Sequence, residues 1–191
     1  MRSRTETTAA VVLRSIDYGE ADRIVTLLTQ RFGKAAYIAR SARRSKKRFG
    51  AALQPLALLE VQVSAARGPL GTLERAEISR AFPRVLAGLD RMQAGFAGLE
   101  LARELTPEHE ADPAVFATVA AFLTALDLSE RPPAQLQLCF VARLLAILGL
   151  SPRLDRCGLC GKAAPPERLG MFDAQLGRRR LAAQTAAIEP G

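Results

Sequence analysis

The amino-acid sequence predicts an α+β protein, with a small β-barrel first and a helical region after it. Residues 1–81 contain five short apolar or alternating runs that are separated by turn residues. Residues 82–150 instead repeat their apolar residues every three or four positions. Short strands at regular intervals are typical of a small closed or partly closed barrel. The last region, residues 151–191, is rich in turn residues and carries a Cys-x-x-Cys pair.

Turn residues bound each strand that the first region predicts. The segment DYGEAD separates the first two runs and RGPLG separates the last two, and both contain the glycine that tight turns favour. The longest connection follows the third run, and it contains SARRSKKRFG and a segment, RFGAALQP, that could form a helical turn. The five strands are expected at 7–16, 23–28, 34–41, 58–63 and 72–80.

Three helices are expected in the second region. The first covers residues 85–105, and the last, at 134–150, is the most apolar. The middle helix begins at Asp112-Pro113, because Asp is a favoured N-cap and Pro is favoured at the first helical position. Helices this apolar must pack on one another or on the barrel.

Positive charge is concentrated in one short region of the chain. The sequence has 27 Lys+Arg and 19 Asp+Glu, for a formal net charge of +8. Residues 31–48 hold eight of the basic residues and no acidic residue, so the remainder has 19 of each. A balanced chain with one basic region predicts contact with a polyanion, and nucleic acid is the first candidate. The alternative is a solvated loop. A membrane surface is disfavoured, because the basic run lacks an interleaved apolar face.

The predicted nucleic-acid interface combines these cations with nearby aromatic rings. Phosphates would contact Lys and Arg, while bases would stack on a ring. Packing of Tyr37 and Phe49 in the core is an equally weighted alternative. The predicted set is Lys34, Tyr37, Arg40, Arg43, Arg44, Lys46, Lys47, Arg48 and Phe49.

Catalysis finds little support in the sequence. The single histidine, His109, lies in a polar loop and is expected on the surface. Neither a phosphate-binding glycine loop nor a pairing of nucleophile and base is recognisable. The protein is therefore predicted not to be an enzyme.

The Cys-x-x-Cys pair, Cys157 and Cys160, has the spacing of a zinc knuckle. One knuckle supplies two ligands, whereas tetrahedral zinc needs four. A second pair is expected about 15–20 residues further on, but that window reads QLGRRR. The remaining cysteine, Cys139, is expected in a helical core. The sequence thus predicts half of a zinc site, and an odd number of cysteines favours a reducing compartment.

These motifs together resemble the bacterial RecO family. The resemblance is specific over residues 8–63, where DYGEADRI, a GK strand and ARRSKKRFGAALQP follow one another in the family's order. It continues over 84–162, with a helical region and the knuckle CGLCG. The resemblance implies an OB-fold at 1–81, a helical domain at 82–150, and a degenerate or truncated zinc ribbon with a tail at 151–191.

The resemblance also implies a role without turnover in DNA repair by homologous recombination. Members of the family bind single- and double-stranded DNA and anneal complementary strands. With the partner RecR they assist loading of the recombinase RecA onto strands coated by single-stranded-DNA-binding protein (SSB), whose acidic tail they bind through the helical domain. A cytoplasmic, nucleoid-associated location is expected. A general OB-type RNA- or single-strand-binding module and an OB-containing nucleic-acid-processing enzyme are the alternatives.

Overall fold

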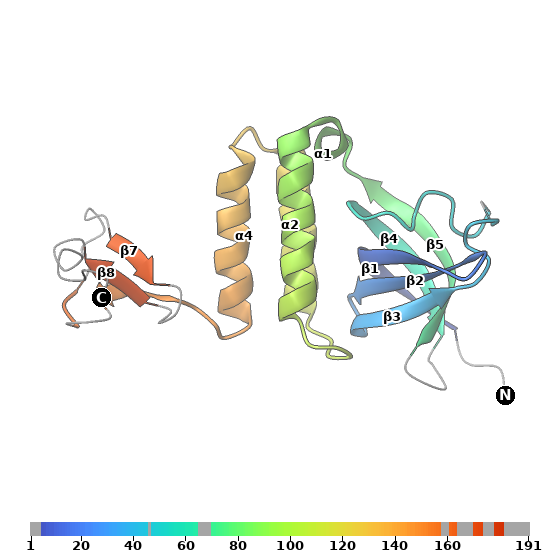
Figure 1. Ribbon diagram of the computed structural model, residues 1–191, viewed down its shortest axis with the longest axis horizontal. Coiled ribbons are helices and arrows are strands. Elements are labelled where there is room, and N and C mark those ends of the chain that lie inside the picture. Colours follow the sequence, from blue (N-terminus) through green and yellow to red (C-terminus); the bar gives the residue numbers. More distant parts are fainter. Residues whose placement is uncertain are drawn as a thin grey trace, which may run out of the picture. The chain divides into compact units, whose positions relative to one another are not determined.

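The computed structural model describes residues 5–45, 47–64, 70–157, 161–163, 170–173 and 178–181 (Figure 1). The chain divides into two compact units, Met1–Ile147 and Leu148–Gly191. Among the described residues, no helix is both long enough and apolar enough to span a bilayer.

Five strands of the first unit close into a barrel: β1 (Thr5–Tyr18), β2 (Asp22–Thr29), β3 (Gly33–Ala39), β4 (Ala57–Ser64) and β5 (Gly71–Ala81). Their order around the barrel is β1-β2-β3-β5-β4, and only the β3–β5 pair is parallel. The long strand β1 closes the barrel, because its first half pairs with β4 and its second half with β2. This OB-type barrel confirms the predicted fold class, and each strand lies within two residues of its expected bounds.

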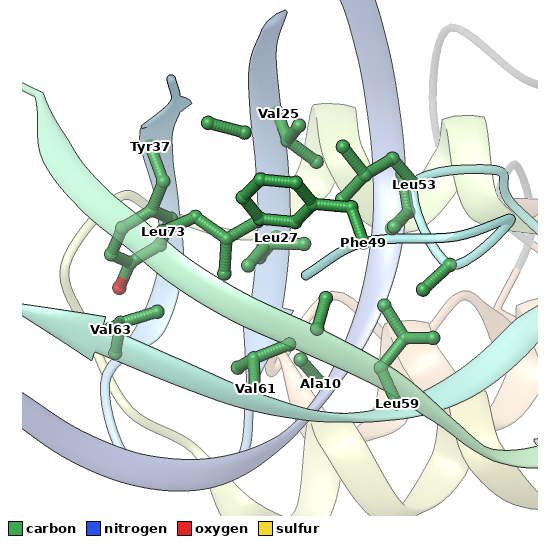
Figure 2. Close-up of a cluster of buried hydrophobic side chains, with 14 of the residues drawn as sticks. Ala10, Val25, Leu27, Tyr37, Phe49, Leu53, Leu59, Val61, Val63 and Leu73 are labelled. Carbon is green, nitrogen blue, oxygen red and sulfur yellow. The ribbon is translucent and has the colours of Figure 1, made fainter. Parts of the chain in front are cut away.

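The interior of the barrel is filled from every strand and from one connection. Inward and outward residues alternate along β3 and β4, as a strand with one buried face requires. Phe49, Ala52 and Leu53 enter the same core from the segment between β3 and β4, and Figure 2 shows Phe49 and Tyr37 both pointing into the cluster. The core consists of Ala10, Val12, Val25, Leu27, Ala35, Tyr37, Ala39, Phe49, Ala52, Leu53, Ala57, Leu59, Val61, Val63, Leu73 and Ala76.

The helical part of the first unit has four helices: α1 (Pro83–Ala87), α2 (Leu89–Leu105), α3 (Pro113–Leu128) and α4 (Pro133–Ile147). The single helix expected at 85–105 is wrong, because Gly88 is extended (φ −117°, ψ 121°) and divides it. Glycine is about 1 kcal/mol less favourable than alanine inside a helix. A tertiary contact also holds α1 separately: the backbone N–H of Arg84 donates to the buried carboxylate of Asp127 on α3 (2.9 Å).

Local chemistry places the start of α3 where the sequence predicts it. The carboxylate of Asp112 accepts hydrogen bonds from the N–H groups of Ala114 (2.8 Å) and Val115 (3.4 Å), which confirms the predicted N-cap. Further along α3, the ring of Phe122 stacks on Phe140 of α4, with centroids 4.3 Å apart. The apolar helices therefore pack on one another as expected.

A clasp joins the helices to the barrel. The ammonium group of Lys34, at the start of β3, donates to the carbonyl of Arg103 near the end of α2 (2.7 Å). The N–H of His109 donates to the carbonyl of Lys34 (2.8 Å). Gly33 has φ +69°, and a Cβ atom there would lie 2.0 Å from the carbonyl oxygen of Glu110. Only glycine allows this approach. His109 itself is exposed, as expected.

The second unit contains a small sheet that the sequence did not predict. Its strands are β6 (Arg153–Cys157), β7 (Gly170–Asp173) and β8 (Arg178–Leu181), in the order β6-β8-β7. Strand β8 pairs in parallel with β6 and antiparallel with β7. The end of the expected tail, residues 182–191, lies outside the described residues.

Replacing Phe49 with Ala is expected to lower the free energy of unfolding by about 3–5 kcal/mol, because it empties a buried aromatic site. Urea denaturation monitored by circular dichroism measures this loss. Phe96→Ala is the matched control, since Phe96 lies on α2 with 46% of its surface exposed whereas Phe49 is 2% exposed. Equal losses in the two variants would show that Phe49 is not a core residue.

Candidate nucleic-acid interface

The basic loop, defined as residues 40–48, begins where β3 ends and folds into consecutive turns. The N–H groups of Arg44 and Ser45 both donate to the carbonyl of Ser41 (3.1 and 3.0 Å). The N–H of Phe49 donates to Ser45 (3.3 Å), which directs the phenyl ring toward the barrel. The segment RFGAALQP, expected to supply a helical turn, forms no full helix but a run of hydrogen-bonded turns at residues 47–53. In these turns the N–H of Ala52 donates to the carbonyl of Phe49 (2.8 Å), three residues back.

Hydrogen bonds to two other parts of the barrel fix the loop in place. At its start, the N–H of Ser41 donates to the carboxylate of Asp22 (2.7 Å), and the N–H of Arg43 donates to the carbonyl of Ala21 (3.1 Å). At its end, the carbonyl of Arg48 accepts from the N–H of Ala76 on β5 (3.0 Å). The loop is thus held against the β1–β2 turn and β5.

Arg48 acts within the loop. Its guanidinium donates to the carbonyl of Arg40 (2.6 Å) and to the hydroxyl of Ser45 (3.2 Å). It also lies 5.0 Å from the centroid of the Phe49 ring, at the distance of a cation–π contact. This half-buried side chain therefore shapes the loop, and its charge is less available to a ligand than those of its neighbours.

Four other cations of the loop face solvent: Arg40, Arg43, Arg44 and Lys47. Among the described residues, none of the four forms an ion pair with a carboxylate. Arginines elsewhere on the first unit do form such pairs, as in Arg31–Glu6 (2.9 Å) and Arg84–Glu130 (2.8 Å). The loop is therefore a fixed surface of uncompensated positive charge, which attracts phosphate groups.

Three of the nine predicted residues do not belong to this surface. Tyr37 and Phe49 are 6% and 2% exposed, so neither ring offers a face to a base, and burial raises the pKa of the Tyr37 phenol. Both rings instead pack in the core of the barrel, which was the alternative interpretation of the sequence. The ammonium of Lys34 is engaged with Arg103 in the clasp. The ninth residue, Lys46, lies outside the described residues.

Sequence reasoning missed the residues that position the loop and those beside it. Asp22 and Ala76 form the hydrogen bonds that hold the loop to the barrel. Nothing in the sequence around either residue indicates that it contacts the loop, which is distant along the chain. Ile78 on β5 is 45% exposed next to the loop. The alternating pattern of β5 could have placed Ile78 on the inner face of the barrel. Its exposure could not be predicted, because it depends on how much of β5 the loop covers.

Two backbone hydrogen bonds join the described residues on either side of the predicted zinc knuckle. The N–H of Cys157 donates to the carbonyl of Lys162 (2.8 Å), and the N–H of Gly161 donates back to Cys157 (3.0 Å). Cys157 is buried at the end of β6, whereas Cys160 lies outside the described residues. Cys139 is exposed on α4, which corrects its expected place in the core.

The described residues do not fit a four-ligand zinc site. The register partner of Cys157 on the neighbouring strand β8 is Arg179, a residue that cannot ligate a metal cation. No group of three or more His, Cys, Asp or Glu lies together in the part of the chain that the structure describes. Tetrahedral zinc would need two further ligands beyond the Cys-x-x-Cys pair.

Two family models match the chain: Recombination protein O N terminal over residues 1–82, and Recombination protein O C terminal over residues 86–190. The DNA repair protein RecO of Myxococcus xanthus is 44% identical over 159 residues, which are 83% of this chain and 64% of that protein. The DNA repair protein RecO of Geobacter sulfurreducens is 39% identical over 158 residues, which are likewise 83% of this chain and 64% of that protein.

A third relative aligns with a larger part of this chain. The DNA repair protein RecO of Anaeromyxobacter sp. (strain Fw109-5) is 39% identical over 183 residues, which are 95% of this chain and 71% of that protein. The chain spans 64% of the length of the M. xanthus relative. Its barrel, its helices and both halves of its sequence agree in this assignment. The chain belongs to the RecO family.

Proposed function

We propose that the chain is a DNA-binding recombination mediator that acts in DNA repair by homologous recombination. The observation that carries this proposal is the set of exposed cations on the basic loop that have no carboxylate partner among the described residues. The family membership supports it, because the matched relatives are named DNA repair proteins. The proposed role includes binding single- and double-stranded DNA and annealing complementary strands.

Annealing in this proposal requires no turnover. Two strands repel each other through their phosphates, and cations that contact both backbones reduce the repulsion while the bases remain free to pair. The loop can supply such cations in a fixed arrangement, since its backbone is bonded to Asp22 and Ala76. Arginine suits this task because its planar guanidinium can form two hydrogen bonds to one phosphate.

The proposed partners act on different parts of the first unit. We place DNA on the basic loop, and the acidic tail of SSB on the helices α1–α4 beyond Pro83. RecR would cooperate in loading RecA, which the protein would contact only indirectly. The proposed location is the cytoplasm, at the nucleoid. A zinc half site at Cys157 and Cys160 is a separate proposal, which the third test below addresses.

The first test is the salt dependence of DNA binding. A variant with Arg40, Arg43, Arg44 and Lys47 changed to Ala should have a shallower slope of log K against log salt. Removing four phosphate contacts reduces the slope by up to about 3.6 on duplex and about 2.8 on single strands. Fluorescence anisotropy over a series of salt concentrations measures both slopes.

The matched control removes the same number of charges from cations that already have carboxylate partners: Arg23, Arg31, Arg84 and Arg103. Its slope should stay close to that of the wild type. If the control flattens the slope as much as the loop variant does, binding follows net charge and the assignment to the loop fails.

The second test separates the two proposed surfaces. The same loop variant should lose annealing of complementary strands but still bind a peptide with the sequence of the SSB tail, because the helices are unchanged. Annealing is followed by fluorescence quenching and peptide binding by calorimetry. Loss of peptide binding as complete as the loss of annealing would place both functions on one surface. Nuclease or ATPase activity that co-purifies with the protein would overturn the mediator proposal.

The third test concerns the metal. Purified protein dialysed against a chelator should hold well under one zinc per chain, because two thiolates and weak additional ligands bind zinc less tightly than four thiolates do. Elemental analysis by mass spectrometry measures the ratio. One zinc per chain that survives dialysis would contradict the half-site interpretation.

A further inference from the structure

The inner face of the barrel is left partly uncovered on β5. Ile78 is the register partner of Leu59, whose side chain is fully buried in the core. Directly opposed residues of an antiparallel pair lie on the same face of the sheet, so Ile78 faces inward. It is nevertheless 45% exposed, whereas Ala76, two residues earlier on the same face, is 3% exposed. The covering segment ends at Ala76, where the carbonyl of Arg48 is bonded.

A shallow groove of about 220 Å³ lies where the cover ends. Lys47 and the segment Phe49–Ala52 line one side of it, and the β5 residues Ala76, Glu77 and Ile78 line the other. Most of this lining is apolar. The carboxylate of Glu77 is paired with the guanidinium of Arg75 (Nε to Oε1, 2.8 Å), which weakens its repulsion of a nearby phosphate. The exposed ammonium of Lys47 is at the rim.

We propose that this Ile78 groove holds one unstacked nucleobase of a DNA single strand whose phosphates contact the basic loop. This inference rests on the proposed function, and it assigns the groove a ligand of a defined chemistry. An apolar groove beside a cation without a carboxylate partner fits a ligand that joins a flat apolar ring to a phosphate. A nucleotide is such a ligand, because its sugar links the base to the phosphate. Because the groove is shallow, the polar edge of the base can stay in contact with water, which avoids a desolvation cost.

The arrangement of charge favours a nucleic acid over an acidic peptide. The exposed cations Arg40, Arg43, Arg44 and Lys47 belong to one loop, and Lys47 also lines the groove. A continuous phosphate backbone can contact several of these cations and still place one base in the groove beside Lys47. A single apolar peptide residue with a few neighbouring acids would use only the end of this surface.

If a base enters the groove, the affinity for single-stranded DNA has two contributions, one from the phosphates and one from the base. Contacts between phosphates and the loop release counterions and depend steeply on salt. Contact between the base and Ile78 involves no charge, so it should contribute equally at low and high salt. A strand that carries bases should therefore bind more tightly than an abasic strand of the same length and charge, and this preference should persist as salt is raised.

The test compares Ile78→Ser with the wild type on two probes, an oligothymidylate and an abasic strand of equal length. The wild type should prefer the oligothymidylate by about three- to fivefold, which is at or below the lower end of the effect of one stacked base. Ile78→Ser should lose this preference while its salt slope stays unchanged. Ile78→Phe, which adds a stacking face, should keep or increase the preference. Leu138→Ser, at a site on α4 that is 70% exposed, is the matched control and should resemble the wild type.

Three results would overturn the proposal. An unchanged preference in Ile78→Ser would show that no base contacts this side chain. Equal weakening on both probes would show that Ile78 supports the loop instead. Binding of the SSB-tail peptide is measured on the same variant, and loss of that binding in Ile78→Ser with the base preference kept would assign the groove to a peptide. If the wild type binds neither probe, both the proposed DNA-binding function and the base-binding groove are wrong. If the wild type binds both strands tightly but without preference, only the base-binding groove is wrong.

Discussion

The burial of Phe49 is the contact on which the interface depends, because it holds a loop of like charges against the barrel. Repulsion between exposed charges is about 1 kcal/mol for a pair 4 Å apart in water, and salt weakens it further. Full burial of a phenylalanine contributes about 1.5–3 kcal/mol, and Ala52 and Leu53 are buried with it. Burial of these side chains therefore outweighs the repulsion within any one pair of exposed cations, and the guanidinium of Arg48 over the ring links the charged segment to its anchor.

The clasp at Lys34 gives the barrel and the helices one fixed arrangement within Met1–Ile147. Gly33 and the carbonyl of Glu110 approach too closely for any side chain to lie between them. The two parts nevertheless differ in charge. On the helices, Arg84 and Arg103 are paired with glutamates, whereas the loop cations are not paired among the described residues. This difference is the physical basis for proposing that DNA contacts the barrel.

Local features of the sequence were enough to predict the strands, the charged loop and the N-cap at Asp112, because alternation, charge density and capping act over a few residues. Features that depend on distant contacts were not predictable. The division of the helix at Gly88 involves Asp127, and the burial of Tyr37 depends on how the whole barrel closes. Lys34 counted toward the basic region, but its partner on α2 is far along the chain. The exposure of Ile78 could be recognised only from strand register.

The central claim is that DNA lies on the basic loop and the adjacent part of β5. Hydrogen–deuterium exchange of the protein with and without single-stranded DNA tests this claim most directly, since it reports on every backbone amide without a substitution. Bound DNA should slow exchange in residues 40–52 and 76–78, while exchange in α4 stays unchanged. Slower exchange confined to α2 and α4, with none in the loop, would contradict it.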